Sequence, residues 1–192
     1  LASCLLEMGS AEESAKYFQQ ALDIRTKRLD KTHHLVAASR LGLARAQFKL
    51  KPDAESLALA SQSLDLLEQK LKAGHPDIAD ASTAVGNMLF QLRLYERAER
   101  RFRTALAIRK DTRRTAPWEL VQSQLLLAQC LISLDKNEEA ESLLRQGIDD
   151  SSKNDALITY HVRACDALAS LYDSLGRPDD ARKVRDAAPK QP

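Results

Sequence analysis

The chain has 192 residues, of which 44% are hydrophobic, 29% are charged and 5% are aromatic, and its formal net charge is +2. This composition is ordinary for a soluble globular protein with a sizeable core, and the near-neutral charge implies no partner chosen by overall electrostatic attraction. Three cysteines without framework spacing favour a reducing, cytoplasmic setting over a disulfide scaffold, and no apolar run approaches the roughly 18 residues of a membrane span.

Small residues recur along the sequence with a period of 42 residues, and a fifth copy is one residue shorter. Such a period predicts a stacked array of structural repeats. Small side chains would let two helices approach closely where they cross. Three columns of Ala, Ser or Gly follow the period: Ala2, Ala44, Gly86, Ala128 and Ala169; Ser14, Ser56, Ala98, Ala140 and Ala181; and Ala21, Ser63, Ala105, Gly147 and Ala188.

Apolar residues recur at three- and four-residue spacing in each copy, which predicts a pair of helices per copy. No segment alternates with period two for long enough to be a strand. Gly9 and Gly176 are expected in the turns between paired helices, and prolines lie at four of the predicted helix starts. The predicted helices cover residues 1–9, 11–30, 33–51, 53–73, 76–92, 95–112, 117–135, 137–151, 154–175 and 178–188.

The sequence therefore predicts an all-α fold, a right-handed superhelical solenoid of about five antiparallel helix pairs within a single domain over residues 1–188. The last helix is short and polar, as an end repeat must be, and residues 189–192 are expected to form a disordered tail. Because Leu1 lies well inside the first helix of its repeat, we expect the sequence to be the C-terminal part of a larger protein. The expected repeats cover about 1–30, 33–73, 76–112, 117–151 and 154–188.

Two segments carry a family resemblance. LASCLLEMGSAEESAKYFQQALDI at the start and LASLYDSLGRPDDARKVRDA near the end resemble the tetratricopeptide repeat (TPR). The longer period, with His75-Pro76 before a first helix, is similar to the kinesin light chain type. The ending is also similar to the C-terminal regions of bacterial serine/threonine kinases and signalling proteins. The resemblance implies a cytoplasmic scaffold that binds a protein or peptide.

In this family the first helices of the pairs line the concave side, so the resemblance implies a groove there. An apolar stripe with amides and two basic groups beside it would suit an extended peptide, whose backbone would meet Asn87 and Gln129. Alternatively, Phe48 and Phe90 merely fill space between repeats. The groove candidates are Arg45, Phe48, Lys49, Thr83, Asn87, Phe90, Gln91, Gln129 and Ile132.

Basic residues are most concentrated in residues 97–114, which cover the second helix of the third predicted pair and the linker after it. Such a patch could be a solvated outer face, or it could meet an acidic protein or a nucleic acid. Acidic residues dilute it, and no aromatic side chain interleaves for base stacking. Its members are Arg97, Arg100, Arg101, Arg103, Arg109, Lys110, Arg113 and Arg114.

Motifs for catalysis or cofactor binding are missing from the sequence: it has no phosphate-binding glycine loop, nucleophile elbow or zinc-protease motif. His161 and Cys165, four residues apart, could hold half of a metal site or could simply pack in the core. We therefore expect no enzyme, no cofactor and no metal.

The function predicted is a non-catalytic protein–protein interaction module that binds a peptide or helix in its concave groove. One alternative is a regulatory or self-associating segment of a bacterial serine/threonine kinase or signalling protein, in which self-association would use the truncated N-terminal repeat. The other is nucleic-acid binding through residues 97–114.

Overall fold

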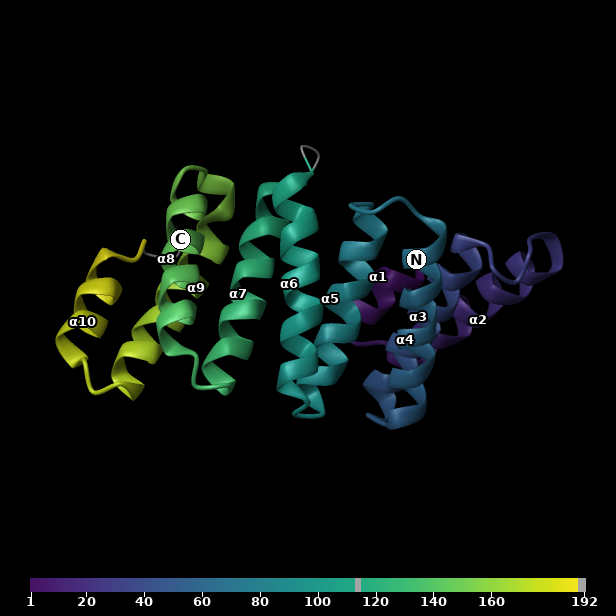
Figure 1. Ribbon diagram of the computed structural model, residues 1–192, viewed down its shortest axis with the longest axis horizontal. Helices are drawn as coiled ribbons and strands as arrows, with labels where there is room; N and C mark the ends of the chain where they lie inside the picture. Colours follow the sequence, from purple (N-terminus) through teal and green to yellow (C-terminus); the bar gives the residue numbers. More distant parts are fainter. Residues whose placement is uncertain (113–114, 190–192) are drawn as a thin grey trace. The chain divides into compact units, whose positions relative to one another are not determined.

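The structure, a computed structural model, describes residues 1–112 and 115–189, and within them every regular element is helical (Figure 1). This confirms the all-α prediction and the ten predicted helices. The helices are α1 (Ala2–Glu7), α2 (Ala11–Arg28), α3 (His34–Leu50), α4 (Ala54–Lys70), α5 (Pro76–Gln91), α6 (Tyr95–Asp111), α7 (Pro117–Ser133), α8 (Asn137–Ser152), α9 (Ile158–Ser174) and α10 (Pro178–Ala187), and a 3₁₀ turn covers Asp155–Leu157.

The largest boundary error is the start of α9, which was expected at residue 154. Asn154 instead caps the 3₁₀ turn, since its side-chain oxygen accepts a hydrogen bond of 3.0 Å from the backbone N–H of Ala156. The α-helix then begins at Ile158. An Asn cap that satisfies a free backbone donor favours such a turn over a further turn of helix.

The chain forms two compact units, Leu1–Ile108 and Arg109–Pro192, and each is described by itself. We call the odd-numbered helices A helices and the even-numbered ones B helices. In the first unit α2 packs on α3, α3 on α4 and α4 on α5, and in the second α7 packs on α8, α8 on α9 and α9 on α10. The single domain over residues 1–188 stays a prediction, and residues 190–192 of the expected tail lie outside the described residues.

The small-residue columns are where neighbouring helices touch. Column residues of the inner copies are buried, and Ala98 and Ala140 have no exposed surface, whereas Ala2, Ala21 and Ala188 at the two ends are half-buried. The approach can be close enough for a hydrogen bond between the helices, since Ser14 Oγ donates to the carbonyl oxygen of Ala2 over 2.8 Å. Large apolar side chains around the columns, such as Phe102, Leu106, Leu131 and Leu144, fill the remaining core.

Four of the five turns from an A helix to its B helix share one backbone conformation. Gly9, Arg93, Asp135 and Gly176, at equivalent places in the repeat, have φ between 57° and 91°. In each turn the next residue's N–H donates back across five residues to a helix carbonyl at 2.8–2.9 Å. This is a Schellman cap, in which glycine avoids the clash of a Cβ. The expectation for Gly9 and Gly176 is thus confirmed, and Arg93 and Asp135 adopt the same turn without glycine.

A partly buried carboxylate links α8 to α9 and to the start of α10. Glu141 of α8 accepts hydrogen bonds from the Tyr172 hydroxyl of α9 at 2.7 Å, from Arg145 Nε at 3.2 Å and from Arg177 Nη1 at 3.0 Å. The Arg177 guanidinium also lies 4.3 Å from the centre of the Tyr172 ring. The hydrogen bond from Tyr172, followed by those from the two arginines, lowers the pKa of Glu141 below its usual value.

Within the described part of the chain, none of the helices combines the length and the apolar character that crossing a bilayer requires.

Two glycines in helix interiors should respond in opposite ways to alanine. A Cβ on Gly42 would lie 2.2 Å from Cε1 of the Phe18 ring, whereas one on Gly147 would meet Gln124 Oε1 at an ordinary 3.5 Å. We predict that Gly42→Ala lowers the free energy of unfolding by about 1–3 kcal/mol through overpacking. Gly147→Ala should raise it by roughly 0.5–1 kcal/mol, because alanine is the better helix former. Urea unfolding followed by circular dichroism measures both, and a Gly42→Ala variant as stable as the parent would contradict this packing.

The lowered pKa of Glu141 makes a second prediction. A carboxylate with a depressed folded-state pKa stabilises the fold above its unfolded pKa of about 4.3, and this contribution is lost as the pH falls through the folded value. Glu141→Gln should therefore cost about 1 kcal/mol at pH 7, and the difference from the parent should shrink at a second, acidic pH below about 4.3. Glu138→Gln, at an exposed position of the same helix, is the control for unfolding measured at both pH values. A Glu141 effect that persists undiminished in acid would mean that packing, not charge, is lost.

Candidate functional site

A cleft of about 280 Å³ lies in the first unit along the A helices α1, α3 and α5. Five of the predicted groove residues line this cleft: Arg45, Phe48 and Lys49 on α3, and Asn87 and Gln91 on α5. The lining consists of Leu6, Glu7, Arg45, Phe48, Lys49, Ala84, Asn87, Met88 and Gln91. The register of the repeat therefore places the predicted polar side chains around one hollow.

The polar side chains that line this first cleft differ in whether they already have hydrogen-bond or ion-pair partners. Arg45 Nη2 lies 3.1 Å from Glu7 Oε1, and Lys49 Nζ donates to the carbonyl oxygen of Leu6 over 3.0 Å, so both basic groups are held in place by α1. Within residues 1–112 and 115–189, the side-chain amides of Asn87 and Gln91 have no hydrogen-bond partner. These amides are therefore available to a ligand.

The other candidates of the first unit have structural contacts. Phe48 lines the cleft but is only 3% exposed, so its ring belongs mainly to the core. Phe90 is half-buried, and its ring centre lies 5.2 Å from that of Tyr95. The Thr83 hydroxyl donates to the carbonyl oxygen of Ala79 at 2.9 Å. These contacts favour the packing interpretation of the two phenylalanines over that of exposed anchors.

A second cleft, of about 370 Å³, lies in the second unit along α7 and α9. It holds the remaining candidates, Gln129 and Ile132. Gln129 follows Asn87 by one 42-residue period, and its exposed side-chain amide has no partner among the described residues. The lining consists of Leu125, Gln129, Ile132, Arg163, Ala167, Ser170, Leu171 and Ser174.

An aromatic pair beside the second cleft was missed by the sequence analysis. Trp118 of α7 is 42% exposed, and its ring centre lies 6.3 Å from that of Tyr160 on α9, with 29° between the ring planes. Arg163, which lines the cleft, places its guanidinium 5.8 Å from the centre of the Tyr160 ring. The repeat register did not reveal this pair, because the last copy is one residue shorter and Trp118 and Tyr160 are not at equivalent positions. Exposed Trp, Tyr and Arg are the residue types most enriched at binding hot spots.

Half of the described members of the predicted basic patch are engaged in internal contacts. Arg101 pairs with Glu68 at 2.9 Å and Asp65 at 3.7 Å, and Arg103 pairs with Glu99 at 2.8 Å. The remaining described members other than Arg109 are exposed, and two lie outside the described residues. The exposed members are Arg97, Arg100 and Lys110, and those outside are Arg113 and Arg114.

Arg109, although predicted in the patch, has a structural role. It is only 8% exposed, and its Nη1 lies 2.5 Å from the hydroxyl of Ser123. Arg25 makes the same contact two periods earlier, where its Nη1 donates to Ser39 Oγ at 2.7 Å. The repetition shows that this arginine is part of the packing between a B helix and the next A helix.

His161 and Cys165 line a cavity of about 510 Å³ between α8, α9 and α10. Cys165 is 3% exposed, and burial raises the pKa of its thiol. His161 Nδ1 lies 3.3 Å from Ser151 Oγ. No group of three or more metal-ligating side chains occurs among the described residues. The pair therefore fits the core-packing interpretation.

Comparison with known proteins identifies the repeat. Models of the tetratricopeptide repeat match residues 1–68 and residues 78–112. None of the curated proteins matches the sequence.

Solved structures extend the likeness over nearly the whole chain. Kinesin light chain repeats from Podosopora anserina are 22% identical, with 98% of this chain and 89% of that one covered and a TM-score of 0.82. BtubC (BKLC) from P. vanneervenii is 16% identical, with 100% and 81% covered and a TM-score of 0.78. The yeast histone chaperone Hif1, described as a scaffold that recruits protein complexes to core histones, is 16% identical, with 98% and 94% covered and a TM-score of 0.56.

Proposed function

Because the chain belongs to the tetratricopeptide-repeat family, as its two sequence matches indicate, we propose that it is a non-catalytic module that binds a peptide or a helix of a partner protein. The partner segment lies in the clefts of the A helices. One observation carries the proposal: positions separated by the repeat period supply unpartnered amides to a cleft in each unit, Asn87 in the first and Gln129 in the second.

An extended segment brings backbone N–H and C=O groups that need partners once they leave water. Asn87, Gln91 and Gln129 can both donate and accept, so each can meet either group. In the second cleft the half-buried side chain of Ile132 supplies apolar surface whose burial contributes to the affinity. The second cleft thus combines the two kinds of contact found in the centres of protein interfaces.

The surroundings of the second cleft support the same function. Trp118 and Tyr160 offer rigid aromatic surface that loses little conformational entropy on binding. Hif1, a neighbour in fold, is described as a scaffold for protein complexes, and the repeat fold itself is a scaffold type, which fits a protein without catalytic activity. The expected setting in a cytoplasmic kinase or signalling protein rests on the resemblance of residues 168–187 and stays a prediction.

The basic helix gives no comparable support for nucleic-acid binding. Arg101 and Arg103 are paired with carboxylates and Arg109 is buried, so fewer cations face solvent than the sequence suggests. Nucleic-acid affinity depends on the number of phosphates that such cations neutralise.

The proposal is tested with peptides selected from a random library displayed on phage. For a selected peptide, the double substitution Asn87→Ala and Gln91→Ala should raise Kd about tenfold or more, because each lost hydrogen-bonding group costs roughly 0.5–1.5 kcal/mol. Ile132→Ala should weaken peptides that occupy the second cleft. Isothermal titration calorimetry gives the affinities.

The matched control is Arg97→Ala with Arg100→Ala on the exposed side of α6, which should leave Kd within about twofold at physiological salt. Peptides that are indifferent to the amides but lost with these arginines would place the binding surface on the B helices and refute the proposal. Phe48→Ala is unsuitable as a probe, because truncating a buried aromatic costs about 3–5 kcal/mol of stability by itself.

A further inference from the structure

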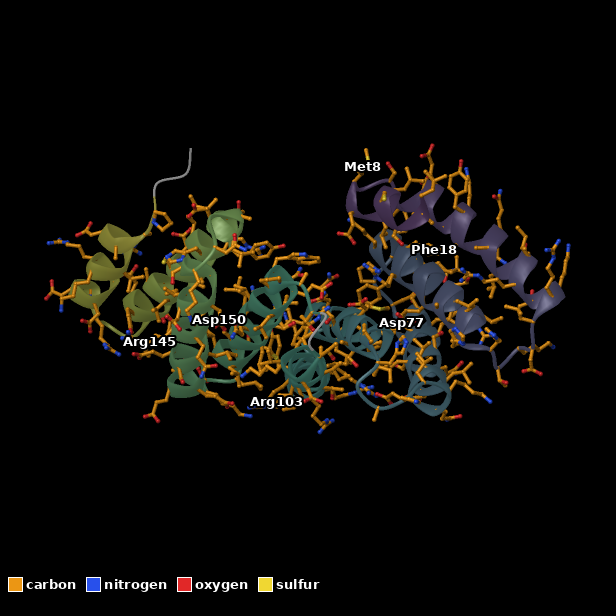
Figure 2. The ribbon with its side chains drawn as sticks, turned by 90° about the horizontal axis from the view of Figure 1, so that it is seen from above. Met8, Phe18, Asp77, Arg103, Arg145 and Asp150 are labelled. Carbon is orange, nitrogen blue, oxygen red and sulfur yellow. The ribbon has the colours of Figure 1, made fainter. Side chains whose placement is uncertain are left out.

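An exposed aromatic pair continues the surface of the second cleft toward the starts of α7 and α9. Trp118 is 42% exposed, and its ring stacks on that of Tyr160 with 6.3 Å between the ring centres. Arg163, which lines the cleft, also lies over the Tyr160 ring and so joins the pair to the cleft. The helix α8, on which Figure 2 labels Arg145 and Asp150, contributes no residue to the lining. The surface is therefore made by the two A helices.

This surface lies between two helix pairs. Within the second unit α7 packs on α8, α9 packs on both α8 and α10, and α7 contacts α9 directly. The cleft runs along the contact between α7 and α9, and not along the outer face of a terminal helix.

Hydrogen-bond donors predominate among the free polar groups of this surface. The indole N–H of Trp118 and the guanidinium of Arg163 have no hydrogen-bond or ion-pair partner among the described residues. Both groups only donate, whereas the Gln129 amide and the Tyr160 hydroxyl can donate or accept. Within residues 115–189, no carboxylate lines the cleft. A ligand that satisfies this surface therefore brings more acceptors than donors.

We propose that this surface binds a proline-rich segment of a partner protein in the polyproline II conformation, which rests on the peptide-binding function inferred above and specifies the ligand of the second cleft. Proline has no backbone N–H, so such a segment offers carbonyl acceptors and few donors. Grooves lined by aromatic side chains recognise this conformation, because the proline rings pack on the aromatic rings. The carbonyl oxygens accept from Trp118, Arg163 and Gln129.

The spacing of the donors suits such a segment. Trp118 and Gln129 are separated by 11 positions on α7, which is about 16 Å along the helix axis. A polyproline II segment advances about 3.1 Å per residue, so about five residues span this distance. An apolar residue next to the prolines then reaches the hollow of about 370 Å³ that Leu125, Ile132 and Leu171 line.

An acidic segment is the rival ligand, because it also brings an excess of acceptors. Arg163 is the one cation in the described lining of the cleft, and it is exposed. A single exposed ion pair contributes little, whereas the two stacked rings offer a large and rigid contact area. A polyproline II segment is also largely ordered before it binds, so it loses less conformational entropy. These terms favour the proline-rich ligand.

The test follows the fluorescence of Trp118, the only tryptophan of the 192-residue chain, during titration with a decaproline peptide. The expected result is a saturable change with a Kd of about 1 mM or tighter. This Kd should differ by less than about twofold between low and high salt, because ring packing and hydrogen bonds to carbonyl groups are not screened as ion pairs are. An acidic peptide of the same length without proline should bind about tenfold more weakly.

Substitutions at the aromatic pair separate ring contact from charge. Tyr160→Ala should raise the Kd of decaproline about tenfold, because it removes one of the two rings, whereas Tyr160→Phe keeps the ring and should stay within about threefold of the parent. Arg163→Gln keeps hydrogen-bond donors without the charge and should also stay within about threefold. Tyr17→Ala, which removes an exposed tyrosine of the first unit, is the matched control and should leave Kd unchanged. Circular dichroism of every variant should match the parent.

Fluorescence that does not respond to decaproline up to about 1 mM would overturn the proposal, as would binding that survives Tyr160→Ala. A preference for the acidic peptide that disappears in Arg163→Gln and at high salt would assign the surface to an acidic partner instead. Peptides selected from the random library separate this result from the proposed function. Selected peptides that lack proline but depend on Ile132 would refute the proline-rich ligand and leave the peptide-binding function standing.

Discussion

Close approach of helices at small side chains is the constraint on which the rest of this structure depends. Ala98 and Ala140 have no exposed surface, and the hydroxyl of Ser14 reaches the backbone of the neighbouring helix. Because a protein interior is packed to the density of an organic crystal, such a crossing tolerates little extra volume. The recurrence of these residues every 42 positions therefore fixes which face each helix turns to its neighbour, and so fixes the faces left for solvent and for partners.

The same period also determines the chemistry of the clefts. Once the small columns are buried, the A-helix positions that remain accessible bring Asn87 and Gln129 to clefts of the two units without partners of their own. The aromatic pair Trp118 and Tyr160 lies near the starts of the two A helices of the second unit. The proposed function thus rests on repeated helix faces.

Periodic features could be predicted from the sequence, and features that depend on neighbours in space could not. Small residues, glycine turns and three- to four-residue spacing gave the ten helices, because each is set by local geometry. Arg109 looked like part of a basic surface, but its burial depends on Ser123 of the next helix. The start of α9 depended on a cap by Asn154 that competes with the helix.

The groove residues show the same difference between features set by the repeat period and features set by neighbours in space. Arg45, Lys49, Asn87 and Gln91 gather at one cleft because they follow the repeat register. Phe48 also lies there, but its ring is buried, since an aromatic side chain at a helix crossing gains more from the core than from solvent. Whether a residue near a groove faces into it or into the core is decided by packing between helices, which a single sequence does not contain.

The central claim, that the 42-residue register sets the helix crossings, is tested most directly by the stability of Ala98→Leu against that of Ala107→Leu. Both residues lie on α6, but Ala98 is fully buried and Ala107 is exposed. Urea unfolding should show that Ala98→Leu loses roughly 1–3 kcal/mol through overpacking, whereas Ala107→Leu changes stability by less than about 0.5 kcal/mol. Equal stabilities for the two variants would contradict the account, because the small columns would then not be the places where the helices meet.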